Sequence, residues 1–197
     1  MTEWWTYGLS DYLMFSPEAY WRLVARHNAA GGPARVAGRL AAFVLVLLVL
    51  RGRAAGTRIA LILLAVGWAC VAWSFHWQRY AEIFLAARWL AAAWGVQAAL
   101  LLAAAARPSG GTPAPGGVRF AGAACLVAAL LYPLLAPLTG HPWTEAEVFG
   151  WLPDPTALAT LGALLSLAGM RTWVRAALLV VPALALAFGA ATRWLLA

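Results

Sequence analysis

The sequence predicts an all-α protein, a polytopic membrane helix bundle of about six transmembrane helices plus an N-terminal interfacial helix. Of the 197 residues, 64% are hydrophobic and only 11% are charged, and the mean hydropathy is +0.78. The apolar residues form long continuous runs, and a helix of about 20 apolar residues is long enough to span a bilayer. A soluble domain of this size would leave too much of that apolar surface in water.

The N-terminal region, residues 1–33, is predicted to lie at the membrane interface. In "FSPEAYWRLVARHN", Ser16 can cap a helix, Pro17 suits its first turn and Glu18 suits its positive end. Aromatic and aliphatic residues alternate there with arginines, as in helices that lie among lipid headgroups. The opening "MTEWWTYGLSDY" lacks a basic segment and a cleavage site, so we expect no removable signal peptide.

Residues 34–197 are predicted to form a six-helix bundle, so that residues 1–197 make a single transmembrane domain. The alternating pattern of a membrane β-barrel is absent, and no repeat at a fixed period is found. Short connections predict that consecutive helices are antiparallel neighbours. The six apolar segments are 34–50, 57–77, 83–106, 118–138, 155–170 and 174–196.

Charged residues divide between the two sides that six crossings create. One side receives seven arginines and no acid: Arg51, Arg53, Arg58, Arg107, Arg119, Arg171 and Arg175. The other side receives the remaining seven arginines and every acid of the chain: Glu3, Asp11, Glu18, Glu82, Glu145, Glu147 and Asp154. The positive-inside rule assigns the arginine-only side to the cytoplasm, so both termini are expected to be extracytoplasmic.

The expected location is the cytoplasmic (inner) membrane of a bacterium, which the heavy use of alanine and arginine suggests. The lipid bilayer is therefore the first predicted partner. A net charge of +7 would also suit a nucleic-acid-binding protein, but the arginines are scattered at the ends of apolar segments rather than gathered in a basic stripe. We therefore expect no nucleic acid partner.

Polar side chains gather on the predicted extracytoplasmic face, above all in "SFHWQRYAEIF" at 74–84. His76 and Tyr80 are spaced for one helix face, provided that the second helix continues that far. His27 and Asp11 lie upstream on the same side of the membrane. The candidate ligand-binding residues are His76, Arg79, Tyr80, Glu82, His141 and Glu145.

Three interpretations of these candidates stay open. His76, His141 and Glu82 have side chains that can hold zinc, copper or nickel, although their spacing matches no known metal motif. A polar pocket for another small ligand is the second interpretation, and plain ion pairs and helix caps are the third.

Several polar residues also have structural interpretations. Thr144 and Glu147 fit a capping box, and Asp154 fits the cap of the fifth span. Arg193 is expected to reach toward lipid headgroups, and most tryptophans to form an interfacial belt.

Enzyme activity is disfavoured, and the sequence identifies no cofactor. The serines lack a GxSxG setting. Cys70 and Cys125 lie inside apolar runs with no CxxC pattern, as structural thiols do. Glu145 and Glu147 are two positions apart and would not share a helix face.

The strings "YGLSDYLMFSPEAYWRLVARHN" (7–28), "FHWQRYAEI" (75–83) and "HPWTEAEVFGWLPDPTALATLG" (141–162) resemble those of an uncharacterised family of bacterial multi-pass membrane proteins, catalogued as a domain of unknown function. The resemblance covers nearly the whole chain and implies a helical integral membrane protein. It brings no activity, substrate or cofactor.

The sequence therefore predicts an integral membrane protein whose extracytoplasmic face, rich in His, Glu, Arg and Trp, binds a small ligand or metal ion for uptake or sensing. The alternative is a non-catalytic accessory or assembly subunit that docks a membrane protein partner on this face. The placement of His76 and His141 relative to each other is the feature expected to distinguish the two.

Overall fold

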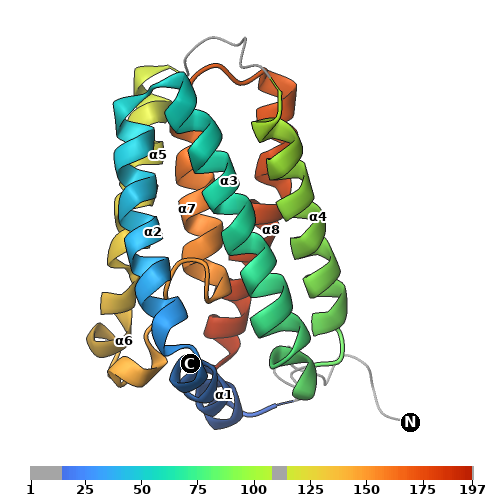
Figure 1. The fold of residues 1–197 in the computed structure, drawn as a ribbon. Coiled ribbons are helices and arrows are strands. Elements are labelled where there is room, and N and C mark those ends of the chain that lie inside the picture. Colours follow the sequence, from blue (N-terminus) through green and yellow to red (C-terminus); the bar gives the residue numbers. More distant parts are fainter. Residues whose placement is uncertain (1–14, 108–114, 197) are drawn as a thin grey trace, which may run out of the picture.

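The described residues, 15–107 and 115–196, form a bundle of helices without a β-strand in a computed structural model (Figure 1). Residues 1–14, which include Asp11, lie outside this description, as does most of the proline- and glycine-rich loop 107–117. Five helical stretches of the described chain are long and apolar enough to cross a membrane. The all-α prediction is therefore confirmed, and five of the six predicted spans correspond to long apolar helices: Gly32–Arg51, Ala54–Glu82, Ala87–Ala105, Gly116–Leu138 and Thr172–Leu195.

Helix α1 (Pro17–Ala30) lies at the lower end of the bundle in Figure 1. Its predicted cap is confirmed, since the Ser16 hydroxyl accepts a hydrogen bond from the Ala19 amide at 3.3 Å. Gly31 separates α1 from α2 (Gly32–Arg51), the first of the long apolar helices.

The second long stretch changes its winding at its lower end. Helix α3 (Ala54–Cys70) continues as a π-helix, η3 (Val71–Trp77), and is followed by a 3₁₀ turn, η4 (Tyr80–Glu82). Helix α4 (Ala87–Ala105) then returns upward beside α3 (Figure 1). Single turns of π-helix inside α-helices are often found at functional sites, and this one contains His76.

The fourth stretch is broken by proline. Helix α5 (Gly116–Leu131) passes into the 3₁₀ turn η5 (Tyr132–Leu134) and the single turn α6 (Leu135–Leu138). Pro133 and Pro137 lack the amide donors that a continuous α-helix would use, so the helix tightens and bends there.

Helix α7 (Pro153–Ser166) stands in the middle of the bundle and is shorter than the predicted segment 155–170. Its 14 residues fall below the ~20 that span a bilayer as a helix. Ten of these residues are buried, because α2, α3, α5 and α8 (Thr172–Leu196) all pack against it (Figure 1).

The chain reaches α7 through a loop, 139–152, that folds into the bundle from the lower end (Figure 1). The loop contains a 3₁₀ turn, η6 (Trp143–Glu145), and its residues 146–149 are buried. Gly67 makes room for it, since a Cβ atom there would lie 3.1 Å from the Phe149 ring. The fifth passage of the chain through the bundle is thus part loop and part helix.

The connections alternate between the two ends of the bundle as the sequence predicts. The turn 52–53 and the segment 167–171 lie at the upper end, whereas α1, α6 and the last turn of α8 lie at the lower end (Figure 1). At the upper end Arg58 Nε donates to the Ala105 carbonyl at 2.9 Å and Arg175 Nη2 to the Leu167 carbonyl at 2.7 Å. These arginines satisfy carbonyl groups that helix ends leave without partners.

Candidate functional site

The π-helix η3 turns His76 into the bundle. The Gln78 backbone amide donates to the Trp73 carbonyl at 3.1 Å. This bond joins residues five positions apart, which is the pattern of a π turn. The His76 side chain is enclosed by Phe75, Tyr80 and Trp94, and the residue is only 3% exposed. Neither of its ring nitrogens has a hydrogen-bond partner among the described residues. A buried polar group without a partner is uncommon and calls for an explanation.

His76 lines a cavity of about 510 Å³, here called the His76 cavity. Volumes of ~300–1,000 Å³ are typical of small-molecule sites. Most of the wall is aromatic or aliphatic. It is built from α1, η3, η4, α4, α8 and the start of α7, through Tyr20, Phe75, His76, Tyr80, Leu90, Ala93, Trp94, Pro153, Asp154, Val181, Leu184, Ala185, Ala187, Phe188, Gly189 and Thr192.

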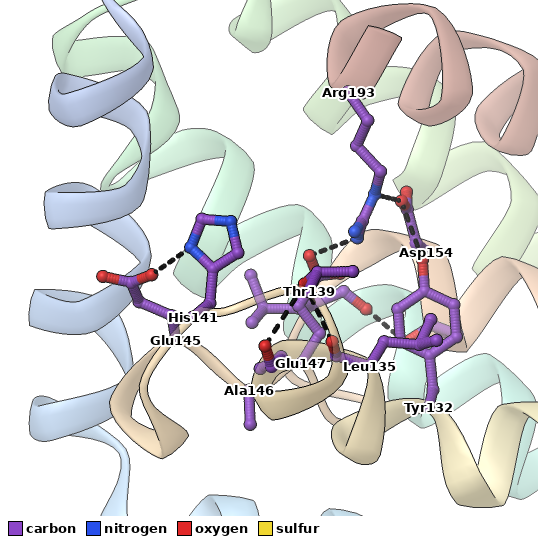
Figure 2. Close-up of polar contacts among 12 residues, drawn as sticks. Tyr132, Leu135, Thr139, His141, Glu145, Ala146, Glu147, Asp154 and Arg193 are labelled. Atoms are coloured by element: carbon purple, nitrogen blue, oxygen red, sulfur yellow. Dashed lines mark hydrogen bonds and ion pairs between the residues drawn. The ribbon is translucent and has the colours of Figure 1, made fainter. Parts of the chain in front are cut away.

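Arg193 holds a charged cluster beside this cavity. Its Nε donates to Asp154 Oδ2 at 2.9 Å and its Nη2 donates to Glu147 Oε1 (Figure 2). Tyr132 adds a hydrogen bond from its hydroxyl to Asp154 Oδ2 at 3.1 Å. Gly189 permits the close approach of α8, because a Cβ atom there would collide with the Asp154 carboxylate.

One guanidinium therefore serves two carboxylates in a nearly dry place. Glu147 is only 4% exposed. Burial disfavours the charged form of this carboxylate, and the hydrogen bond from Arg193 offsets that cost. When one of the two acids holds a proton, the cluster of Arg193, Glu147 and Asp154 carries no net charge.

A second hollow of about 750 Å³, here called the His141 groove, lies between α1 and the loop after α6. His141 Nδ1 lies 2.7 Å from Glu145 Oε2 (Figure 2), and the imidazole rests on the Trp21 ring with 4.1 Å between ring centroids. Arg193 also lines this groove, whereas its partner Asp154 lines the His76 cavity. The Arg193–Asp154 ion pair therefore lies between the two hollows.

The six predicted ligand-binding residues fall into three places. His76 and Tyr80 both line the His76 cavity, although the regular helix ends before them and gives way to η3 and η4. His141 and Glu145 line the His141 groove. Arg79 and Glu82 form an ion pair 3.8 Å long with partly exposed side chains.

The predicted metal ligands do not come together. His76 and His141 line different hollows. Within the described ranges, no three His, Cys, Asp or Glu side chains gather in a way that could hold a metal ion. The second interpretation, a pocket for another small ligand, is supported by the His76 cavity.

His27 has a structural role, together with Asn28. His27 Nε2 is 3.2 Å from the Trp151 carbonyl and its ring stacks on Trp151 at 4.2 Å. Asn28 Nδ2 donates to the carbonyls of Thr144 and Ala146 at 2.8 and 3.1 Å. These bonds tie α1 to the loop 139–152 and satisfy carbonyl groups that the loop would otherwise bury unpaired.

Three structural interpretations from the sequence are wrong. The capping box at Thr144 is absent, because η6 has Pro142 at its cap position and Glu147 pairs with Arg193 instead. Asp154 does not cap α7, which has Leu152 at that position. Arg193 bonds to the two acids rather than reaching outward to headgroups.

Sequence reasoning therefore missed the charged cluster of Arg193, Glu147, Asp154 and Tyr132. Two acids inside an otherwise apolar stretch, and one arginine near the end of the last helix, were its visible signal. Their partnership joins residues that are 39 and 46 positions apart, so no local spacing shows it.

Comparison with known proteins adds one match. Residues 17–196 match a family described as "Family of unknown function (DUF6064)". The comparisons with curated proteins and with solved structures gave no match.

Proposed function

The chain belongs to the DUF6064 family, a family of unknown function, and from its geometry we propose that it is an integral membrane protein that binds a small ligand in the His76 cavity. Binding would serve uptake or sensing. The proposed location is a bacterial cytoplasmic membrane, with six passages of the chain, α1 at the membrane interface and both termini extracytoplasmic.

The observation that carries the proposal is the unpaired imidazole of His76. Leaving a buried donor or acceptor without a partner costs about 1–3 kcal/mol. His76 has two such nitrogens and faces a cavity large enough for a small molecule. A ligand that hydrogen-bonds to the ring would recover part of that cost.

Membrane insertion is supported by the outer surface of the bundle. Large apolar side chains on α2, α3, α4 and α8 point outward, among them Leu40, Val66, Val96 and Leu184. In a bilayer, lipid tails would cover these faces, so the apolar side chains would not contact water. The arginine-only connections at one end of the bundle, with the acids of the described residues at the other, support the proposed orientation.

The accessory-subunit alternative is supported by exposed tryptophans at the acidic end of the bundle, such as Trp77, Trp89 and Trp143. Tryptophan is common in protein interfaces, but it is equally common at the level of lipid headgroups. Ligand binding is therefore the better-supported function, because the buried His76 has no comparable structural explanation.

Small molecules that copurify with the protein test the proposal. We would extract wild type, His76→Phe and Trp73→Phe from membranes in polymer-bounded lipid discs and identify bound molecules by native mass spectrometry. Trp73 is the matched control, because it lies in the same π-helix but is 60% exposed on the outer surface. Helix content and size-exclusion profiles would establish that each variant folds.

We expect a molecule that is enriched over bulk lipid in wild type and in Trp73→Phe, and that is absent from His76→Phe. The same set of lipids on all three proteins, with none enriched, would contradict a specific ligand in this cavity.

A further inference from the structure

Building on the proposed function, we infer that the ligand is an uncharged, lipid-soluble molecule with an apolar body and a hydroxyl headgroup, and that it enters the His76 cavity sideways from the bilayer between α4 and α8. Three observations support this: where the cavity opens, where it is closed, and the two buried nitrogens of His76 that have no partner among the described residues.

The cavity opens onto the apolar side of the bundle. Its wall includes residues that are exposed on the outer surface, Ala93 of α4 and Leu184 and Phe188 of α8. Leu184 is 64% exposed, so the rim lies on a face that lipid would cover in a membrane. A molecule dissolved in the bilayer could enter there without crossing a charged surface.

The route from the aqueous end is closed by charge and by α1. Asp154 lines the cavity and its partner Arg193 lines the His141 groove, so their 2.9 Å ion pair lies between the two hollows. Tyr20 of α1 completes the wall on this side. A ligand arriving from water would have to separate a partly buried ion pair, which is costly.

The wall suits a hydrocarbon body. The lining consists mainly of aromatic rings and aliphatic chains, such as those of Phe75, Tyr80, Trp94, Leu90 and Val181. A hydrocarbon body that enters this cavity would cover few polar groups of the wall. Recognition must therefore depend on a small number of polar contacts.

His76 is the residue of the wall whose two side-chain nitrogens are both buried and without a partner among the described residues. Asp154 is already bonded to Arg193 and Tyr132, and the Thr192 hydroxyl donates to the Phe188 carbonyl at 2.9 Å. A neutral imidazole offers one donor and one acceptor. A hydroxyl can pair with either nitrogen, whichever tautomer His76 adopts.

Charged headgroups fit this lining poorly. None of the described lining residues is an arginine, and the one charged residue, Asp154, would repel a carboxylate or phosphate. A trimethylammonium group can lie against aromatic rings, but it has no hydrogen-bond donor or acceptor and would leave His76 unpaired. Burying an ion without a partner is far more costly than burying a hydroxyl that has one.

The experiment compares three photoreactive probes with the same 12-carbon chain and diazirine, ending in a hydroxyl, a carboxylate or a trimethylammonium group. Each would be added at equal mole fraction to wild type in lipid discs, and crosslinked peptides would be mapped by mass spectrometry. His76→Phe, the conservative His76→Gln and the outward-facing control Trp73→Phe would be treated in the same way.

We expect the alcohol to label α4 near Leu90 and α8 near Leu184 about tenfold more than either charged probe, which is the effect of roughly one hydrogen bond. His76→Phe should remove that preference. His76→Gln, which keeps a donor and an acceptor, should restore most of it, and Trp73→Phe should label like wild type.

The outcomes separate the two proposals. Equal or stronger labelling of these peptides by a charged probe would overturn the uncharged hydroxyl ligand but leave a ligand site in place. No enrichment of any probe over the lipid-facing surface of α2, in wild type as in His76→Phe, would overturn both. Labelling by the alcohol that is unchanged in His76→Phe would overturn the role of the imidazole.

Discussion

Two buried histidines illustrate how local contacts distinguish structure from function. His27 has its partner, the Trp151 carbonyl, and stacks on the same residue. His76 has neither nitrogen bonded to any residue within the described ranges. His27 therefore holds α1 against the loop 139–152, and His76 remains available for a ligand.

His27 should make stability depend on pH. Burial lowers its pKa from 6.5 to about 4, while the Trp151 carbonyl partly opposes this effect. Between these two values the unfolded chain binds a proton that the folded protein excludes, so stability is present above pH 6.5 and is lost as the pH falls toward 4. At pH 5 the loss should be about 2 kcal/mol.

Melting temperatures of wild type and His27→Gln at pH 7.5 and pH 5 measure this loss. Glutamine can still donate to the Trp151 carbonyl but does not titrate. The drop on acidification should be clearly smaller in the variant, and equal drops in the two proteins would contradict this role of His27.

At the scale of the helices, the placement of α7 depends on glycine. Gly122 of α5 and Gly162 of α7 face each other so closely that a Cβ atom on Gly162 would lie 2.6 Å from the Gly122 carbonyl oxygen and 2.7 Å from the Leu126 amide. Small residues let helix backbones approach in this way. The α5–α7 contact positions the start of α7, where Asp154 lines the His76 cavity.

Gly162→Ala should therefore destabilise the bundle by about 1–3 kcal/mol, because the added methyl group meets backbone that cannot move aside. Gly95→Ala is the matched control: Gly95 lies inside α4 and has open space around its position. Alanine there should leave stability unchanged or raise it by up to about 1 kcal/mol. Thermal or denaturant unfolding of the two variants measures the difference, and equal effects would show that the α5–α7 contact is not tightly packed.

For the whole molecule, the sequence predicts the long helices well. The predicted segment 118–138 corresponds to Gly116–Leu138, and 34–50 to Gly32–Arg51. Continuous apolar runs with arginine or glycine at their ends carry enough local information for this. His76 and Tyr80 also share a cavity, but not through the regular helical spacing that the sequence suggests, because the chain is a π-helix up to Trp77 and a 3₁₀ turn from Tyr80.

The predicted segment 155–170 matches the structure less well, because the chain enters the bundle there as a buried loop followed by the short helix α7. Residues 146–149 are buried in a loop because α2 and α3 provide small residues against it, Gly38 and Gly67. That burial depends on tertiary contacts, and an apolar loop and an apolar helix look alike in sequence. The charged cluster around Arg193 was missed for the same reason, because its members meet only through the fold.

We propose that the bundle crosses a membrane with its acidic, histidine-bearing end outside. Cysteine labelling in spheroplasts tests this orientation, in a background where Cys70 and Cys125 are alanine. Single cysteines would replace Trp143 and Arg53, exposed residues at opposite ends. With a membrane-impermeant maleimide, we predict that Trp143→Cys is labelled in intact spheroplasts and Arg53→Cys only after lysis. The reverse pattern, or labelling of both before lysis, would contradict the account.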